Sequence, residues 1–564
     1  MAFVLIGFMG AGKSTAAREL AAALGSQSYD SDELLAERFG HPVAREFELH
    51  GEQAFRAAEE QLVCELLARA RREGAEPVIA LGGGSVLSER VREALVHHVT
   101  VLLDVDAQTA WRRVDAARAG RHAGAAETAH ETDAAEGADA VETAETAGAR
   151  SLAGERPLAR ERERFLELHA SRAELYERLA DAIFREPPRG TLARAARALR
   201  ALAAAPAGTR MLWASAASGS YPVLVGRGLV CEAGRERIEA VWPLERSRSR
   251  AFCVSDETVL ALYGARLGEM TASFAIAPGE AQKTLASAQL AWQAMVEAGI
   301  TRADHVVALG GGVVGDLAGF CAACYQRGVP VVHVPTSLVA QVDSAYGGKT
   351  GVDLPQAKNY VGAYHQPAGV LVDPDALATL PAAELAAGWV EVLKTALIAG
   401  GELWEAVAAG GGTDERAILA CARTKLAVVA QDERDGGRRQ VLNLGHTVGH
   451  AIETATGYAR YRHGEAVGLG LLAALRLSGQ PQLREQVGEL MSARGLPVTL
   501  NDERDEGLPS GEAAVDAILQ AMTRDKKRLG EDVPFVLVRA PGEVQHGCAV
   551  AAQDVRAAVR ELLA

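Results

Sequence analysis

Three histidines lie close together in a stretch of the chain that holds few other metal ligands. His446 and His450 are four residues apart, so on a helix both would point from one face. His463 follows, and Gly464 and Glu465 open the next predicted helix. Imidazole is the commonest metal ligand in proteins, so this spacing suggests a metal site. Taken alone, the stretch leaves open whether the histidines bind a metal or lie on helix surfaces.

A glycine-rich motif near the start of the chain predicts nucleotide binding. Residues 3–6 form a predicted buried strand, and GFMGAGKS follows it directly, which is the GxxxxGK[ST] pattern between a strand and a helix. Its glycines let backbone N–H groups turn toward phosphates at a helix N-terminus. Lys13 would reach the terminal phosphates, and Ser14 would bind Mg²⁺. The predicted ATP-binding residues are Gly10, Ala11, Gly12, Lys13, Ser14 and Thr15.

A second glycine-rich turn, GGGVVGD at 310–316, follows the predicted strand 305–309 and opens a helix. GxGxxG in this setting is typical of a pyrophosphate cradle, so it favours dinucleotide binding. The usual ribose-binding acid is missing, because no Asp or Glu closes the next strand near Pro335. Asp256, which ends another predicted strand, is a candidate for that contact.

Length and composition limit the class of protein. A chain of 564 residues is too long for one core, and its net charge of -14 argues against nucleic-acid or membrane-surface partners. There is no apolar run of membrane-spanning length, and the chain opens on a strand rather than a signal peptide. Seven cysteines without a framework predict reduced thiols and a cytoplasmic location. Cys321 and Cys324 form a CxxC in an apolar segment, where core packing is a better interpretation than zinc binding.

The first part of the chain resembles shikimate kinase over nearly the whole domain. Besides the P-loop, the motifs are DSD at 30–32, GEQAFRAAE at 51–59 opening a helix, GGG at 82–84 after the strand 78–81, and RPL at 156–158. The resemblance implies phosphoryl transfer from ATP to the 3-hydroxyl of shikimate, with Lys13 and Asp32 as catalytic residues. Two arginines suit a carboxylate, and a carboxylate beside a hydroxyl can accept its proton. The implied shikimate-binding residues are Asp32, Arg56, Gly82, Gly83, Gly84 and Arg156.

An insertion at 123–150 departs from the family pattern. It carries seven acidic residues, one Arg, and no Leu, Ile or Phe. Such a composition buries too little apolar surface to offset the entropy of ordering, so we predict that the segment is disordered. The insertion leaves the identity of the lid arginine open. Arg113, Arg118 and Arg121 are candidates for contacting ATP, and Arg118 is the one we assign.

The rest of the chain resembles 3-dehydroquinate synthase from end to end. The motifs that carry the resemblance are PGExxK at 278–283, the 310–316 turn, PTS at 335–337, QVDS at 341–344, GGKT at 347–350, KN at 358–359, EVxK at 391–394, Lys425, DE at 432–433, Arg439, the histidine stretch and DKK at 525–527. The resemblance implies a Rossmann-like NAD-binding subdomain, followed by a mainly helical subdomain that carries metal and substrate groups.

Carried over residue by residue, the resemblance implies that Glu391, His446 and His463 bind one divalent metal, Zn²⁺ or Co²⁺, while His450 faces the substrate. Three protein ligands leave coordination positions for substrate hydroxyls. The implied catalytic residues are Lys349, Lys394, Arg439 and His450. The implied NAD contacts are Asp256, Gly279, Glu280, Lys283, Gly312, Val313, Val314, Gly315, Asp316, Thr336, Ser337, Lys349, Lys358, Asn359 and Thr379. The implied substrate is 3-deoxy-arabino-heptulosonate 7-phosphate, called the heptulosonate phosphate below. Its implied contacts are Arg327, Lys349, Lys394, Lys425, Arg439, Asn443, His450 and Lys526.

Together these observations predict an α/β protein with a P-loop kinase domain, a parallel sheet with flanking helices, at 1–185. A linker at 186–212, an NAD-binding subdomain at 213–375 and a helical subdomain at 376–564 would follow. We expect a cytoplasmic bifunctional enzyme of the shikimate pathway that uses ATP with Mg²⁺, NAD⁺ and one divalent metal. Its expected partners are small molecules: shikimate, ATP and 3-deoxy-arabino-heptulosonate 7-phosphate. Dimerisation through the second domain is an expectation from the family.

Two alternatives stay open. A metal-dependent alcohol dehydrogenase of similar fold would release NADH, but its substrates are usually uncharged and would not need Lys349, Lys394 and Arg439 together. The kinase half could instead be a regulatory or inactive nucleotide-binding module beside an active synthase. NADH accumulation with an alcohol would favour the first alternative, and ADP release that depends on shikimate would exclude the second.

Overall fold

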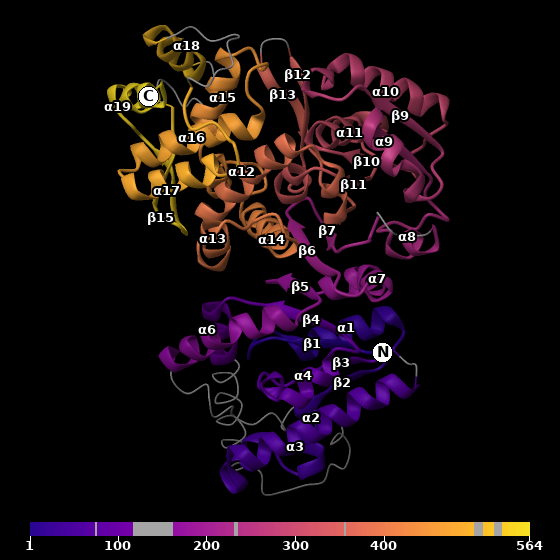
Figure 1. Cartoon of the computed structure of the whole chain (residues 1–564). Helices are drawn as coiled ribbons and strands as arrows, with labels where there is room; N and C mark the ends of the chain where they lie inside the picture. Colours follow the sequence, from indigo (N-terminus) through magenta and orange to yellow (C-terminus); the bar gives the residue numbers. More distant parts are fainter. Residues whose placement is uncertain are drawn as a thin grey trace, which may run out of the picture. The chain divides into compact units, whose positions relative to one another are not determined.

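The computed structural model describes residues 1–73, 76–116, 162–230, 235–354, 357–500, 511–523 and 533–563 (Figure 1). The chain forms two compact units. The first holds 1–204 and 208–213, and the second holds 205–207 and 214–564. The predicted insertion at 123–150, Arg118, Arg121, Arg156 and Lys526 lie outside the described residues.

The first unit is built on a parallel sheet with strand order β2-β3-β1-β4-β5, and the start of β6 pairs with β5. The strands are β1 (Phe3–Ile6), β2 (Ser28–Asp30), β3 (Val78–Ala80), β4 (Val99–Asp104), β5 (Ala182–Arg185) and β6 (Arg210–Ala216). The residues of β1 and β3 are all buried, as expected for a parallel sheet covered on both faces. The expected P-loop fold with a parallel sheet is confirmed.

Helices flank this first sheet. They are α1 (Lys13–Leu24), α2 (Ser31–Phe39), α3 (Val43–Glu73), α4 (Glu89–Leu95), α6 (Arg162–Leu179) and α7 (Thr191–Ala204). Helix α3 is interrupted at Gly51, whose φ of 81° breaks the helical path, so a second helical segment starts there as the sequence predicted. Residues 186–212, which the sequence suggested as a linker, hold α7 and the start of β6, and α7 belongs to the first unit.

The second unit contains a parallel sheet with strand order β7-β14-β11-β10-β8-β9. Its strands are β7 (Gly219–Val225), β8 (Ala251–Asp256), β9 (Ala272–Ile276), β10 (His305–Gly310), β11 (Val331–Pro335) and β14 (Gly369–Val372). Helices α10 (Leu285–Glu297) and α11 (Gly312–Cys324) pack together beside this sheet (Figure 1). Val254, Val306 and Val331 lie in the core between them. The predicted Rossmann-like architecture is confirmed.

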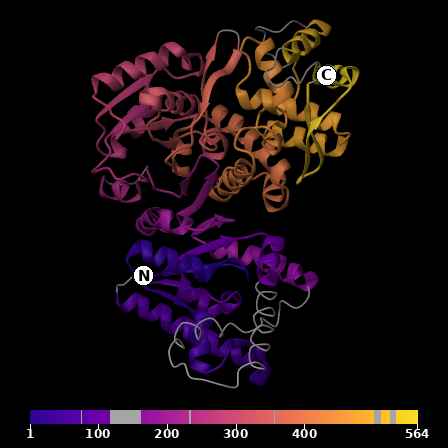
Figure 2. The same cartoon turned by 180° about the vertical axis from the view of Figure 1, so that it is seen from behind.

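The remainder of the second unit is mainly helical. An antiparallel hairpin, β12 (Lys349–Leu354) and β13 (Ala357–Tyr364), precedes it. Figure 2 shows this helical part, in orange to yellow, beside the magenta sheet part of the same unit. The elements that matter for the site are α9 (Glu257–Tyr263), η7 (Ala340–Ser344), η8 (Pro374–Thr379), α12 (Ala382–Ala399), α14 (Glu415–Gln431), η9 (Arg438–Asn443), α15 (His446–Ala455) and α16 (His463–Leu477). The others are α8 (Arg235–Val241), α13 (Gly401–Ala408), α17 (Pro481–Ser492), α18 (Glu512–Thr523), α19 (Ala552–Arg560), β15 (Phe535–Ala540) and β16 (Glu543–Cys548).

Helix α16 is the centre of the helical part, because most of its residues are buried. Glycines let its neighbours approach closely: a Cβ at Gly464 would overlap the backbone oxygen of Ala387 in α12, and one at Gly470 would overlap that of Gly445 at the start of α15. Helices α15 and α16 lie side by side (Figures 1 and 2). This close packing brings the starts of α15 and α16 to the middle of α12.

Two expectations from composition can be compared with the structure. Cys321 is buried, as expected for a core residue, whereas Cys324 is exposed, so core packing explains only the first cysteine of the CxxC. Within the described ranges, no helix combines the length and the apolar character needed to cross a bilayer.

Candidate active sites

The P-loop of the first unit lies where strand β1 ends and helix α1 begins. Gly12 precedes α1 with a φ of 87°, a left-handed conformation that glycine adopts without strain. Lys13 is buried, and its Nζ donates to the backbone oxygens of Gly7 (2.9 Å) and Phe8 (3.2 Å). Ser14 and Thr15 follow in the first turn of α1. The backbone N–H groups of that turn form an anion site of the kind that binds phosphates.

A glycine loop after β3 forms the second half of this site. A Cβ at Gly82 would lie 2.7 Å from Asp32 Oδ1 and 2.5 Å from Glu59 Oε1. A Cβ at Gly84 would collide with the guanidinium of Arg56. Only glycine therefore leaves room for these charged side chains, and the structure brings Asp32, Arg56 and the loop together.

Glu59 orients the arginine of this loop. Arg56 Nη1 lies 2.6 Å from Glu59 Oε2, and Ser85 Oγ donates to the other oxygen of Glu59 at 2.7 Å. Glu59 is buried, so this ion pair is shielded from water. The sequence motif contained Glu59, but its spacing alone assigned no role to it.

A second arginine that the sequence analysis missed also reaches the loop. Arg172 of α6 is buried, and its Nη1 donates to the backbone oxygen of Gly83 at 3.1 Å. Tyr176, one turn further along α6, donates to the same oxygen. The arginine predicted for this position, Arg156, lies outside the described residues, as does Arg118. Of the lid candidates, Arg113 is described, and its Nη1 lies 3.4 Å from the backbone oxygen of Gly10.

In the second unit, the three predicted metal ligands meet. Glu391 of α12, His446 at the start of α15 and His463 at the start of α16 offer ligand atoms that all lie within 4.8 Å of one another. Glu391 Oε1 is 3.7 Å from His446 Nε2 and 3.5 Å from His463 Nε2. Both histidines therefore turn Nε2 toward the same carboxylate.

The chemistry of this group fits a divalent metal. Glu391 is 1% exposed, and among the described residues neither of its carboxylate oxygens has a hydrogen-bond partner. Its one close ion-pair neighbour besides the histidines is Lys394, at 2.5 Å. One buried carboxylate with two imidazoles is a set of ligands that suits Zn²⁺ and similar ions.

A second group of possible ligands overlaps the first. His450, Glu453 and His463 also offer atoms within 4.8 Å of one another. The rings of His446 and His450 lie 5.2 Å apart, centroid to centroid. Helical spacing alone therefore does not separate a metal ligand from a substrate-facing histidine here, and His463 belongs to both groups.

Negative charge is concentrated around His463. Burial by itself would lower the pKa of His463, but the carboxylates of Glu453 and Glu391 raise it to about 10. Burial would raise the pKa of Glu453, but His463 and Lys358 lower it to about 2. The same carboxylates would attract a metal cation.

Four of the predicted basic residues are paired with an acid or with backbone oxygens: Lys349, Lys394, Lys425 and Arg439. Lys394 Nζ lies 2.8 Å from Asp343 Oδ2, and Lys425 binds the other oxygen of Asp343 and its backbone oxygen. Although burial opposes it, the two lysines hold the pKa of Asp343 well below its usual range. Asp343 therefore anchors both lysines beside Glu391.

Lys349 and Arg439 lie on the hairpin side of this group. Lys349 Nζ is 2.6 Å from Asp435 Oδ2. Arg439 is 1% exposed and donates to the backbone oxygens of Gly347, at 2.9 Å, and Glu433. Asn443 ends η9, just before α15. Lys349 thus belongs to β12, and Arg439 and Asn443 belong to η9.

Several of the predicted NAD-binding residues lie at the carboxyl edge of the sheet. Strands β11, β10 and β8 are neighbours, so Thr336 and Ser337, the 310–316 turn and Asp256 follow adjacent strand ends. Gly311 caps α11 without a side-chain hydrogen bond, so the first turn of α11 offers N–H groups to an anion. Thr379 lies beside α9, and its Oγ1 is 2.6 Å from the hydroxyl oxygen of Tyr263.

Lys283 joins several of these elements. Its buried Nζ lies 2.8 Å from Glu280 Oε1 and 3.2 Å from Asp316 Oδ2, and Gly279 turns the chain with a φ of 117°. Lys358 of β13 lies 3.5 Å from Glu280, and Asn359 follows it with a φ of 53°. Asp256 caps α9 by accepting from Val259 N.

One predicted substrate contact lies elsewhere. Arg327 is exposed and follows the C-terminal end of α11, whereas the 310–316 turn is at its N-terminal end. A helix of 13 residues is about 20 Å long. The structure therefore does not bring Arg327 to the metal group within this chain.

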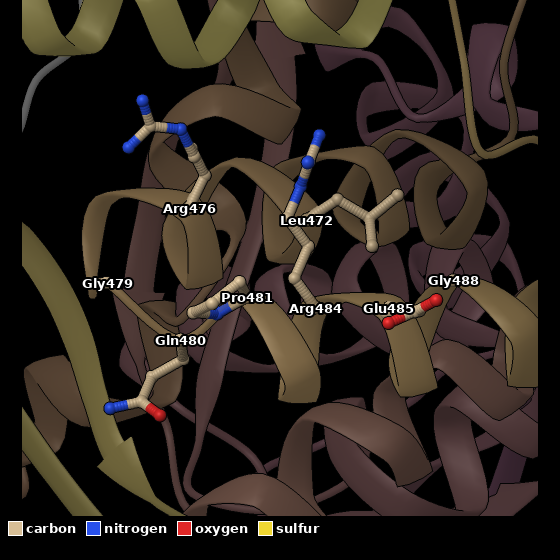
Figure 3. Close-up of a pocket in the computed structure, with 8 residues that line it drawn as sticks. All are labelled: Leu472, Arg476, Gly479, Gln480, Pro481, Arg484, Glu485 and Gly488. Carbon is tan, nitrogen blue, oxygen red and sulfur yellow. The ribbon is translucent and has the colours of Figure 1, made fainter.

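The pocket drawn in Figure 3 is separate from these residues. It has a volume of about 470 Å³ and lies between α16 and α17. Its lining residues are Leu472, Arg476, Gly479, Gln480, Pro481, Arg484, Glu485 and Gly488. None of the residues predicted to bind a cofactor or substrate lines it.

Comparison with known families agrees with the division of the chain. The shikimate kinase family model matches residues 9–142. The models for the N-terminal and C-terminal parts of 3-dehydroquinate synthase match 273–387 and 388–528.

Two curated relatives illustrate the match of the second unit. The 3-dehydroquinate synthase of Caulobacter vibrioides is 42% identical over 368 residues, which cover 61% of this chain and 95% of the relative. That of Halorhodospira halophila is 41% identical over 350 residues, which cover 59% of this chain and 94% of the relative.

Two solved structures share the fold of this part. The 2-epi-5-epi-valiolone synthase of Streptomyces hygroscopicus subsp. jinggangensis 5008, with NAD⁺ and Zn²⁺ bound, has a TM-score of 0.53 and 26% identity, and the match covers 61% of this chain and 97% of that one. A 2-deoxy-scyllo-inosose synthase complexed with carbaglucose-6-phosphate, NAD⁺ and Co²⁺ has a TM-score of 0.53 and 24% identity, covers 62% and 99%, and shows the fold alone.

Proposed function

We propose the residue roles given below. The chain belongs to the 3-dehydroquinate synthase family and carries a shikimate kinase domain before the synthase. The protein is a bifunctional shikimate-pathway enzyme. One domain phosphorylates shikimate with ATP, and the other converts 3-deoxy-arabino-heptulosonate 7-phosphate to 3-dehydroquinate and phosphate. The assignment of each residue below is our proposal.

The observation that carries the synthase proposal is the group of Glu391, His446 and His463, in which a buried carboxylate faces two half-buried imidazoles. We assign this group to one Zn²⁺ or Co²⁺, the ions bound in the two similar structures. When bound, the metal would polarise adjacent substrate hydroxyls, and NAD⁺ would accept and return a hydride. His450 would face the substrate.

The chain's own residues would neutralise and orient the substrate. Its carboxylate and phosphate need positive charge, and Lys349, Lys394, Lys425 and Arg439 supply it within an acidic chain. Asp343 fixes Lys394 and Lys425 in place, because it pairs with both. The first turn of α11, together with Lys283, Glu280 and Asp316, would hold NAD⁺.

In the first unit, the P-loop would hold ATP with Mg²⁺, through Lys13 and Ser14. Asp32 would accept the proton of the attacking shikimate hydroxyl. Arg56 and Arg172 would bind the carboxylate, since both guanidinium groups reach the 82–84 loop. Arg172 is added to the sequence-based set by its position in the structure.

The test measures both activities on the full-length protein. Wild type should release ADP only when shikimate is present, and should release phosphate from the heptulosonate phosphate without net NADH. Lys13→Ala should lower ADP release by about 10²- to 10³-fold and keep phosphate release, because one phosphate contact and its charge are removed. Glu391→Gln should lower phosphate release from the heptulosonate phosphate and keep ADP release.

Each alternative function gives a different result. Steady NADH accumulation with an alcohol would favour the dehydrogenase and overturn the synthase assignment. Wild-type protein that binds ATP but releases no ADP with shikimate would make the first unit a regulatory nucleotide-binding module.

Location and assembly are proposals of the same kind. The cysteines in the described part of the chain are all free, which supports a reducing compartment such as the cytoplasm. A homodimer through the second unit would appear as twice the chain mass of 59.3 kDa in light scattering.

A further inference from the structure

Glu453 is a buried carboxylate beside the metal group. The sequence motifs assigned no role to this residue. It lies on α15, three residues after His450 and seven after His446, so the three share one face of the helix. Its side chain is 2% exposed. Oε1 lies 3.4 Å from His463 Nδ1 and 3.1 Å from Lys358 Nζ, and among the described residues Oε2 has no hydrogen-bond partner.

We propose that Glu453 is a positioning residue that orients His463 for metal binding and holds Lys358 of β13 to the metal site. The proposal rests on the function proposed above and deepens it. His463 turns Nε2 toward Glu391 and Nδ1 toward Glu453. A proton on Nδ1 that is shared with a carboxylate leaves the lone pair on Nε2, which is the atom that must bind the metal.

The other histidine ligand has the same arrangement with a different acceptor. His446 turns Nε2 toward Glu391, while its Nδ1 lies 3.1 Å from the backbone oxygen of Leu444. Each ligand histidine thus has an acceptor behind Nδ1. That acceptor is neutral for His446 and negatively charged for His463, so Glu453 can also make His463 the stronger donor to a metal.

Lys358 extends this contact toward the cofactor side. It pairs with Glu453 and Glu280, and its Nζ lies 4.7 Å above the ring of Tyr458, which follows α15. Glu280 pairs with Lys283, and Lys283 pairs with Asp316 of α11. A line of alternating charges therefore runs from the proposed dinucleotide site to the metal ligand.

Burial explains why this line depends on Glu453. A carboxylate shielded from water is stable only when it is paired, and here Glu453 pairs with Lys358 and can accept a hydrogen bond from Nδ1 of His463. Substituting Glu453 would leave Lys358 and His463 without their shared anion. We therefore expect both metal and NAD⁺ to bind less tightly.

The test compares metal affinity in full-length variants by competition between apo-protein and a chromogenic zinc chelator. Glu453→Ala should bind Zn²⁺ about 10- to 100-fold more weakly than wild type. Glu453→Gln keeps an acceptor oxygen but loses the charge, so its zinc affinity should lie between those of wild type and Glu453→Ala. Glu453→Gln should also raise the Kd for NAD⁺ in calorimetry. Glu453→Gln serves alone if the alanine variant does not fold.

A matched control separates positioning from general destabilisation. Asp304 is also a buried carboxylate with an ion pair, to Arg250, but it lies just before β10, at the end of the strand opposite the site. Asp304→Asn should lower the Tm and keep the zinc affinity within about twofold of wild type. Glu453 variants that bind zinc and NAD⁺ as tightly as wild type would overturn the proposal. Wild type that binds no zinc would overturn the proposed metal site itself.

Discussion

The two units hold their charged site residues in different ways. In the first unit, Lys13 and Arg172 donate to backbone oxygens of glycine-rich loops, and one ion pair, between Arg56 and Glu59, supports the shikimate side. In the second unit, the charges are paired with one another: Glu391 with Lys394, and Asp343 with both Lys394 and Lys425.

This difference follows from what each site must bind. A phosphate is bound largely by backbone N–H groups, so the first unit needs only a few side-chain charges. The second unit must neutralise a carboxylate and a phosphate with side chains that are themselves buried, and a buried charge is stable only beside an opposite charge. We therefore expect substitutions in the first unit to affect mainly chemistry, and those in the second to affect both chemistry and stability.

The largest expected effect concerns the metal group. His446→Ala should lose the metal and about 10³-fold in synthase activity, because metal stabilisation of the transition state is worth several kcal/mol. Shikimate kinase activity should be unchanged. Metal content measured by atomic emission checks the first claim, and the two activity assays check the others.

His450→Ala is the matched variant for this prediction. It should keep the metal and lose synthase rate, since His450 faces the substrate in our assignment. Loss of metal in His450→Ala with retention in His446→Ala would place the ion in the group of His450, Glu453 and His463 instead.

The next effect tests the difference in stability between the units. Asp343→Ala removes the acid that pairs with the buried Lys425 and leaves Lys394 with Glu391 alone, and removing one partner of a buried pair costs about 3–5 kcal/mol. Arg172→Met, whose guanidinium donates to a backbone oxygen, should cost about 1–2 kcal/mol and mainly raise the KM for shikimate. Chemical denaturation of each full-length variant measures both values. Equal losses would remove the distinction between the units.

The elements were largely predictable from the sequence because hydrophobic runs and glycine turns are local signals. The strands expected at 3–6 and 305–309 correspond to β1 and β10, and the helix expected to open at Gly464 is α16, which begins one residue earlier. Local patterns also placed the P-loop. The Ala- and Arg-rich pattern at 191–204 also predicted a helix, which could be the last of the first domain, and α7 occupies these residues.

The acids that complete the second site were not predictable in this way. Asp343 meets Lys394 across 51 residues, and Glu453 meets Lys358 across 95, so no periodicity connects them. Glu453 did carry one local signal, its position on the same helix face as His446 and His450. Arg172 carried no local signal. The RPL motif upstream already supplied Arg156 as the second arginine for the shikimate carboxylate.

A smaller effect concerns a buried carboxylate outside both sites. Burial would raise the pKa of Asp304, but hydrogen bonds from Arg250 and Thr301 lower it to about 2, from an ordinary value of 3.8. A lowered pKa stabilises the fold fully above about pH 4, and this contribution is lost as the pH falls toward 2. Asp304→Asn should therefore be less stable than wild type by about 1–2 kcal/mol at pH 6, and the gap should close toward pH 2. Urea denaturation across this pH range measures it. A gap that stays constant with pH would mean that the carboxylate's charge contributes nothing.

The smallest expected effect tests whether an acid competes with the substrate. Lys349 pairs with Asp435, and its side chain is 47% exposed, so the pair is worth at most about 1 kcal/mol. A substrate phosphate that binds Lys349 must displace Asp435, so Asp435→Asn should lower the KM for the heptulosonate phosphate by about two- to fivefold with little change in kcat. Because the pair is partly exposed, the difference should shrink at high salt, when the charges are screened. A higher KM in Asp435→Asn would show instead that Asp435 orients Lys349 toward the phosphate, and the exposed edge of the second site would then follow the same rule of paired charges as its buried centre.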